Sequence, residues 1–185
     1  MFLLAGLGNP GEKYKLTRHN IGFLVISCMS KKYQTSVINK KNFIAEVQKS
    51  SSLLFVKPQT FMNDSGLSLQ AISKYFDIPN DKIIVVHDDL DLPFGTVKFK
   101  IGGGSGGHNG LKSIDAHISS DYLRIRVGIG KPQDKSKVIT YVLDNFSKEE
   151  LNALVDIIAH TIDAIEFYIK EESIEELKSK YTIKK

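Results

Sequence analysis

One histidine, one aspartate and three asparagines have the types and positions that general acid–base chemistry needs. His19 precedes a predicted helix, Asp88 follows a strongly apolar segment, and Asn9, Asn63 and Asn109 fall in predicted loops. A histidine whose second nitrogen is held by a carboxylate is a general base suited to neutral pH. Asparagine amides can orient a water or stabilise an oxyanion without titrating. These residues therefore predict acid–base catalysis without a cysteine nucleophile.

The elements that must position these side chains include several short strands. The apolar residues 2–7 predict a buried strand, and Ile83–His87 (IIVVH) predicts a central one. Val97–Ile101 and Leu123–Gly128 alternate apolar and basic residues, as half-exposed strands do. Loops at the ends of such strands are where α/β proteins build their sites. We therefore expect an α/β fold, with residues 1–185 forming a single domain whose mixed central β-sheet is flanked by helices.

Helical periodicity marks the layers expected beside this sheet. One predicted helix has an apolar stripe that includes its cysteine: Ile21, Leu24, Val25, Cys28 and Met29. Ser147 and Glu150 form a capping box that begins a long helix reaching Lys170. The expected inward row of that helix is Leu151, Leu154, Val155, Ile158, Ile162, Ile165 and Ile169.

Composition limits the class of protein. The 185 residues are 42% hydrophobic and 25% charged, with a formal net charge of +4 and one cysteine. A lone cysteine excludes an internal disulfide and fits a reducing compartment. The first residues are typical of a strand rather than a secretion signal, and no apolar run approaches the roughly 18–20 residues that cross a bilayer. We expect a cytoplasmic monomer without membrane contact.

Two glycine patterns suggest activities that their context argues against. Gly6, Gly8 and Gly11 match the G-x-G-x-x-G pattern of dinucleotide sites, but Pro10 interrupts it and no acidic residue follows at the ribose-binding distance. Gly103–Gly107 matches the G-x-S-x-G pattern of serine esterases. That elbow is a sharp strand-to-helix turn, whereas this serine lies inside a glycine run. We favour a flexible loop that lets backbone approach a ligand.

The acidic segment His87–Asp91 (HDDLD) raises the possibility of a metal site. Consecutive residues at a strand end point in opposite directions, so at most half of these side chains could converge. Hard cations also draw oxygen ligands from several segments. A solvated acidic turn with one working carboxylate is the better interpretation, and we expect no metal.

Four basic residues alternate on the two half-exposed strands: Lys98, Lys100, Arg124 and Arg126. A solvated basic sheet face is the default interpretation of this pattern. The functional alternative is a phosphate clamp beside the glycine loop.

Five motifs follow one another along nearly the whole chain. They are GLGNPG-x2-Y-x3-RHN-x-G at Gly6–Gly22, P-x-TFMN-x-SG at Pro58–Gly66, HDDLDLP-x-G at His87–Gly95, K-x-GGG-x-GGHNGLKS at Lys100–Ser113 and RIRVGIGKP at Arg124–Pro132. In these motifs, their order and their spacing, the chain resembles the bacterial-type peptidyl-tRNA hydrolase family.

The resemblance implies an enzyme that needs no cofactor and no divalent metal. Its substrate would be peptidyl-tRNA, bound at the acceptor arm and 3′ end. The enzyme would cleave the ester between a peptide, or an N-blocked amino acid, and the 3′-terminal ribose, and so recycle tRNA from prematurely released peptidyl-tRNA.

The resemblance also assigns roles to residues. It makes His19 the general base, Asp88 its partner, and Asn9 the residue that distinguishes blocked from free aminoacyl-tRNA. Asn109 is expected to position the attacking water or stabilise the oxyanion, with Asn63 or a backbone N–H. The implied substrate-binding residues are Tyr14, Phe61, Met62, Asn63 and Asn109, and the implied tRNA phosphate contacts are Lys100 and Arg126.

Three alternatives remain at this stage. The chain could be an RNA-binding protein that keeps the fold without catalysis, a serine esterase using Ser105, or a metal-dependent hydrolase using Asp88–Asp91. The presence of His19, Asp88 and Asn109 argues against the first.

Overall fold

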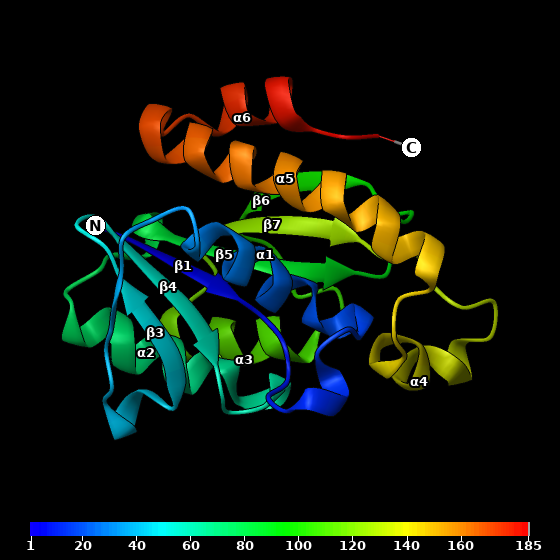
Figure 1. The fold of residues 1–185 in the computed structure, drawn as a ribbon, viewed down its shortest axis with the longest axis horizontal. Coiled ribbons are helices and arrows are strands. Elements are labelled where there is room, and N and C mark those ends of the chain that lie inside the picture. The colour runs from blue at the N-terminus through cyan, green and yellow to red at the C-terminus, as the bar shows by residue number, and fades with distance from the viewer. Residues whose placement is uncertain (185) are drawn as a thin grey trace.

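A computed structural model describes residues 1–184, and within them seven strands form one sheet (Figure 1). Its strand order is β2-β3-β4-β1-β5-β7-β6. The strands are β1 (Phe2–Gly6), β2 (Ser36–Val37), β3 (Ala45–Lys49), β4 (Leu53–Pro58), β5 (Ile83–Asp89), β6 (Val97–Ile101) and β7 (Leu123–Gly128).

The sheet is mixed, as predicted. Strands β4, β1, β5 and β7 are parallel to one another, whereas β2, β3 and β6 pair antiparallel at the two edges. The carboxyl ends of the parallel strands therefore lie at one end of the sheet. Strand β5, the predicted central strand, ends there with Asp88 and Asp89.

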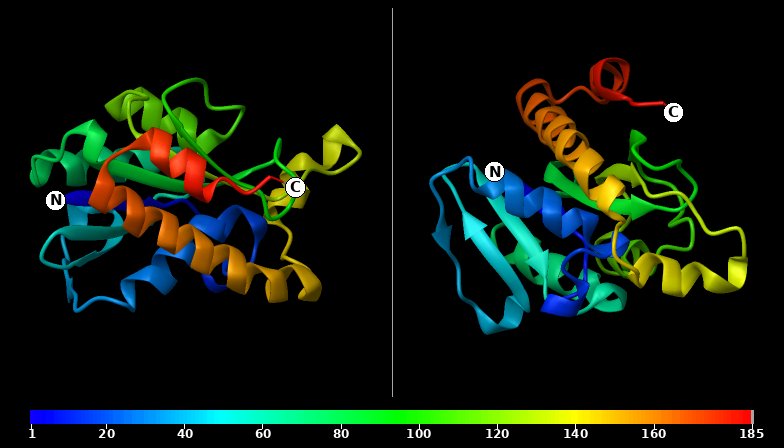
Figure 2. Two further views of the ribbon diagram at one scale, coloured as in Figure 1. Left: turned by 90° about the horizontal axis from the view of Figure 1, so that it is seen from above. Right: turned by 45° about the vertical axis from the view of Figure 1, so that its right-hand side comes forward.

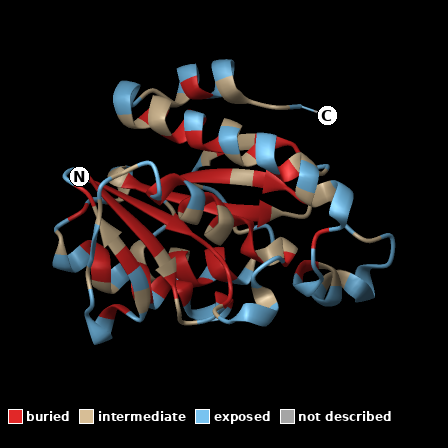
Figure 3. Cartoon of the chain, in the orientation of Figure 1, coloured by how far each residue is buried: buried red, intermediate tan, exposed pale blue. Residues whose placement is uncertain are grey.

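Helices cover both faces of the sheet (Figures 1 and 2). Helices α1 (Ile21–Ser30), α5 (Lys148–Glu171) and α6 (Ile174–Tyr181) pack on one face, and α2 (Ser65–Tyr75) and α3 (Asn109–Ile118) pack on the other. The parallel strands between them, β4, β1, β5 and β7, are almost entirely buried (Figure 3), whereas the edge strand β2 is exposed. Such burial is typical of parallel strands covered on both faces.

The short helix α4 (Val138–Leu143) lies apart from these layers, at the end of the molecule where it projects away from the sheet (Figure 2). It contacts the 3-10 turn Arg18–Asn20, which carries His19. This turn precedes α1, as expected.

The predicted helices form, but two expected buried positions are wrong. Cys28 is exposed, because α1 buries Ile26 and Ser30 instead and presents Cys28 to solvent. Val155 on α5 is 68% exposed, because the buried face of α5 runs through Ile157, Thr161, Ala164 and Tyr168. The capping box of Ser147 and Glu150 is confirmed. None of the helices in residues 1–184 is long and apolar enough to span a membrane.

Candidate active site

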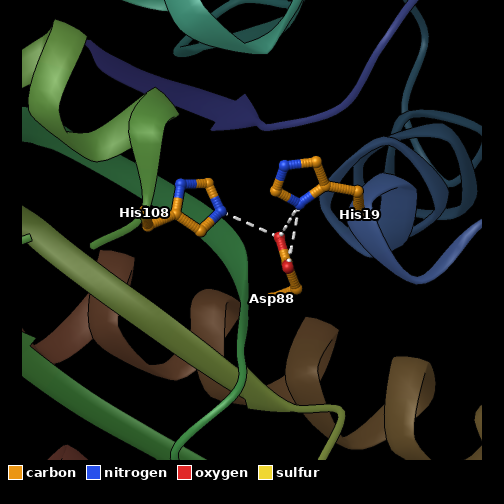
Figure 4. A group of neighbouring side chains, drawn as sticks. All are labelled: His19, Asp88 and His108. Carbon is orange, nitrogen blue, oxygen red and sulfur yellow. Dashed lines mark hydrogen bonds and ion pairs between the residues drawn. The ribbon is translucent and has the colours of Figure 1, made fainter. Parts of the chain in front are cut away.

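The centre of the site is a hydrogen-bonded pair of His19 and Asp88 (Figure 4). Nδ1 of His19 lies 2.9 and 3.0 Å from the two carboxylate oxygens of Asp88. Because a carboxylate only accepts, Nδ1 is the protonated nitrogen and Nε2 is left as the basic one. Among residues 1–184 no partner occupies Nε2 of His19, and the ring lines a cleft.

Two glycines allow the His19 turn to approach the end of β5. A side chain on Gly6 would overlap the carbonyl of Gly22, and a side chain on Gly22 would overlap the carbonyl of Val86. The amide of Leu7 donates to the Val86 carbonyl at 3.0 Å, while the amide of Phe23 donates to the Leu7 carbonyl at 3.3 Å. The glycines of the first motif therefore serve close packing of a helix start against two strands.

Electrostatics favours the paired state of His19 and Asp88. Burial lowers the pKa of His19, but the charge and hydrogen bond of Asp88 outweigh it, so the pKa lies above its usual value of 6.5. Burial raises the pKa of Asp88, but the His19 and His108 rings beside it bring that pKa well below its usual range. Asp88 is thus an anion at neutral pH, buried to 2% exposure.

The asparagine side chains approach the cleft from three segments. Asn9 is buried, and its Oδ1 accepts a hydrogen bond from the amide of Met62 at 2.8 Å. Asn63 and Asn109 are exposed, in the 3-10 turn Met62–Asp64 and at the first residue of α3. The predicted aromatic residues are close together as well, since the rings of Tyr14 and Phe61 meet edge to face with 6.5 Å between their centroids.

All ten residues predicted for the site line one cleft of about 690 Å3. They come from five segments distant in the sequence: Asn9, Tyr14, His19, Phe61, Met62, Asn63, Asp88, Lys100, Asn109 and Arg126. The glycine loop 104–107 and α4 form further walls of the same cleft.

The four basic residues of β6 and β7 share a face, but they have different surroundings. Arg124 is only 2% exposed, so a fully solvated basic face is wrong at this position. Its guanidinium donates to the carbonyl of Gly104 at 2.9 Å and to Asp115 at 2.8 Å, which fixes the glycine loop to α3. Arg126 is paired with Asp89 at 2.8 Å. Lys100 lies against the loop, where a side chain at Gly103 would collide with its Nζ.

The acidic residues of the HDDLD segment diverge. Asp88 faces His19, Asp89 pairs with Arg126, and Asp91 is exposed, with Lys131 3.8 Å away. These three carboxylates therefore do not converge on a common position in the described chain. Ser105 lies in the loop wall of the cleft, and within residues 1–184 its hydroxyl has no hydrogen bond to a histidine that could activate it.

The sequence interpretation missed a second histidine at the pair. Nε2 of His108 lies 2.9 Å from Oδ1 of Asp88, so the carboxylate stands between two imidazoles (Figure 4). The available signal was its place in the GGHNG motif, directly before Asn109. The apolar wall contributed by α4 was also missed: Val138, Ile139, Val142 and Leu143.

His19, Asp88 and His108 together offer two nitrogens and an oxygen within 4.8 Å of one another, a set that could hold a metal ion. The hydrogen bonds favour a proton-linked arrangement instead. Nδ1 of His108 accepts from the amide of Leu111 at 3.4 Å, so its proton is on Nε2, the nitrogen that faces Asp88. A ligating nitrogen must be unprotonated.

Known proteins resemble the chain over its full length. The family model for peptidyl-tRNA hydrolase matches residues 3–185. The peptidyl-tRNA hydrolase of Aliarcobacter butzleri (strain RM4018) is 61% identical over 184 residues, covering 100% of both chains. That of Sulfurovum sp. (strain NBC37-1) is 48% identical, covering 100% of this chain and 97% of its own. A crystal structure of peptidyl-tRNA hydrolase from Acinetobacter baumannii has a TM-score of 0.93 at 32% identity, covering 100% of this chain and 96% of that one.

Proposed function

Because the chain belongs to the peptidyl-tRNA hydrolase family, a family of hydrolases acting on peptidyl-tRNA esters, we propose that His19 is its general base. The substrate is a peptide, or an N-blocked amino acid, esterified to the 3′-terminal ribose of tRNA. One observation carries the proposal. His19 is held through Nδ1 by Asp88 while Nε2 is left at the surface of the cleft.

In the proposed reaction, Nε2 of His19 takes a proton from a water that attacks the ester carbonyl. Asp88 fixes the tautomer of the ring and stabilises the imidazolium that forms. Collapse of the tetrahedral intermediate then releases the ribose oxygen, which recovers a proton from the imidazolium. An ester is labile enough that no covalent enzyme intermediate is needed.

The exposed amides of Asn109 and Asn63 are suited to hold the water or to donate to the developing oxyanion. One such donor is typically worth about 10²–10³ in rate. Tyr14, Phe61 and Met62 complete the apolar side of the substrate position. Recognition of the 3′ end of tRNA suits an enzyme that recycles many tRNAs. We propose that the enzyme does so in the cytoplasm and as a monomer.

The test of the general base is His19→Ala. We expect the rate on N-acetyl-aminoacyl-tRNA to fall by about 10²–10⁴, while tRNA binding is retained. In the unsubstituted enzyme, kcat/KM should decline as the pH falls through the raised pKa of His19, because protonated imidazole cannot accept a proton. His160→Ala is the control, since Nε2 of His160 bonds the carbonyl of Tyr181 outside the cleft. Near-normal turnover by the His19 variant would remove it from this role.

We further propose that Lys100 and Arg126 bind tRNA phosphate. The two should contribute unequally, because Arg126 already pairs with Asp89, whereas Lys100 has no carboxylate partner in the described chain. Lys100→Ala should weaken binding and lower the slope of log K against log salt by slightly under one unit, and Arg126→Ala by less. Filter binding across a salt series measures both slopes, and unchanged slopes would contradict phosphate contact.

A single-turnover assay distinguishes the enzyme from the alternative, an RNA-binding protein without catalysis. Release of N-acetyl amino acid at substoichiometric substrate supports the enzyme, and binding without release supports the alternative. Unchanged activity in Ser105→Ala and after chelation of divalent metals is expected under the His19 mechanism.

A further inference from the structure

We propose that His108 is a positioning residue for the catalytic pair, which holds the Asp88 carboxylate in the orientation that serves His19. The proposal rests on the function proposed above. It concerns a side chain to which the sequence motifs gave no role. Its basis is the geometry of three rings and one carboxylate at the end of β5.

The tautomer of His108 is set by the helix that follows it. His108 is the N-cap of α3, and its Nδ1 accepts from the amide of Leu111. An N-cap side chain satisfies one of the amides left free at a helix start. With Nδ1 accepting, the proton must be on Nε2, which then donates to Asp88 Oδ1 at 2.9 Å.

Asp88 depends on the two imidazoles for its hydrogen bonds. Its side chain is 2% exposed, and within residues 1–184 the carboxylate oxygens accept only from His19 and His108. A buried anion needs donors, because desolvation is otherwise uncompensated. After loss of one ring the carboxylate could therefore rotate, and its negative charge would be shared with one N–H donor fewer.

The ring of His87 packs against the ring of His108. The two rings meet edge to face with 5.2 Å between their centroids, and Nδ1 of His87 donates to the backbone carbonyl of Asp88 at 2.7 Å. Burial and the neighbouring His108 lower the pKa of His87 to about 4. His87 is therefore neutral at pH 7 and does not compete for the Asp88 carboxylate.

The groups that face His19 are few. On β5 it meets Asp88, and from the start of α3 it meets His108, with 5.0 Å between ring centroids. The other elements packed against its turn, α1 and α4, contain no Asp, Glu, Lys, Arg or His. Arg18 of the turn itself pairs with Glu150, 3.0 Å away. The state of Asp88 therefore dominates the basicity of His19.

Removal of the His108 donor should have two effects. The carboxylate loses its fixed orientation, which lowers kcat with little change in KM. Its negative charge is no longer shared with the His108 N–H, so it stabilises protonated His19 more strongly and moves the acid limb of the rate profile to higher pH. A hydrogen bond to a charged group of this kind corresponds to about a ten- to one-hundred-fold change.

The experiment compares His108→Ala and His108→Gln in the full-length enzyme, with N-acetyl-aminoacyl-tRNA as substrate. His117→Gln is the matched control, because it makes the same change at the other end of α3. We expect His108→Ala to lower kcat by about ten- to one-hundred-fold and to shift the acid limb upward. In His108→Gln the side-chain amide can still donate, so both the loss of kcat and the shift of the acid limb should be smaller than in His108→Ala.

Two outcomes would overturn the proposal. One is wild-type kcat and pH profile in His108→Ala. The other is an equal loss in the Ala and Gln variants with the acid limb unmoved, which indicates packing alone. NMR titration of the His19 imidazole in the His108 variants distinguishes a positioning role from packing alone without relying on turnover, because only a positioning role predicts a shift in the pKa of His19. His19→Ala, measured in parallel, separates the two hypotheses: activity there would reject the general base, whatever the His108 variants do.

Discussion

Within residues 1–184, the side chain of Asn9 has one polar group without a hydrogen-bond partner, its NH2. Its Oδ1 is occupied by the Met62 amide. Its backbone is held on both sides by Asn20, which accepts from the Asn9 amide at 2.8 Å and donates to the Asn9 carbonyl at 2.9 Å. The NH2 of Asn9 is therefore the group available to the cleft, and it can only donate. An acyl carbonyl on a blocked residue is a fitting acceptor, whereas a free α-ammonium is not.

Asn9→Asp tests this assignment at the residue level. The carboxylate can still accept from Met62, but it lacks the donor and attracts a cationic α-amine. We expect the ratio of kcat/KM for N-acetyl-aminoacyl-tRNA over free aminoacyl-tRNA to fall by roughly tenfold. Asn9→Ala is the comparison, since it removes both functions of the amide. An equal loss on both substrates would show that Asn9 serves the reaction and not the choice of substrate.

Residue types predicted the cleft better than they predicted the surroundings of each side chain. The family motifs named ten residues that line one cleft. They did not show that Arg124 is buried, because its partners Gly104 and Asp115 are brought to it by a loop and a helix. Nor did they show the second hydrogen bond on Asp88, which depends on how α3 begins.

Among the elements, the glycine loop depends on Arg124. Two glycines just before the loop, Gly102 and Gly103, and two within it, Gly106 and Gly107, have positive φ, a conformation that glycine adopts easily and other residues rarely do. The bonds of Arg124 to the Gly104 carbonyl and to Asp115 give this loop a fixed place beside the cleft.

Arg124→Met should therefore affect both stability and binding. We expect the free energy of unfolding to fall by about 2–3 kcal/mol, less than the ~3–5 kcal/mol of a fully buried pair because Asp115 is partly exposed. KM for peptidyl-tRNA should rise as the loop loses its place. Urea denaturation and steady-state kinetics measure the two effects. Lys98→Met, on the same face, should change stability little, and an equal loss there would contradict a specific role for Arg124.

The strands were the most predictable elements, and the buried faces of helices the least. Strand β5 is recognisable because a run of five mainly apolar residues fits a strand covered on both faces. The exposure of Cys28 could not be read from spacing. Because Gly22 and Ser30 are small, α1 packs on the sheet through a face that differs from the predicted apolar stripe. Val155 is exposed for a similar reason, since α5 packs through Ile157 and Ala164.

At the level of the whole molecule, the cleft is assembled from both halves of the sheet and from a helix that lies apart. Arg18 connects these parts. Its guanidinium stacks on Tyr141 of α4 at 4.3 Å and pairs with Glu150 in the first turn of α5. The turn that carries His19 is thus fixed to both helices. The apolar wall from α4 was invisible in the sequence, because Ile139 and its neighbours have the pattern of any short helix.

The residues after α6 pair with the outermost strand of the sheet. Ile183 exchanges two backbone hydrogen bonds with Val97 of β6, at 3.0 and 3.3 Å. An exposed sheet edge is a template for strand addition by another chain. Here part of that template is already occupied within the same polypeptide. At Val97 the sheet edge is therefore closed to strand addition by another chain.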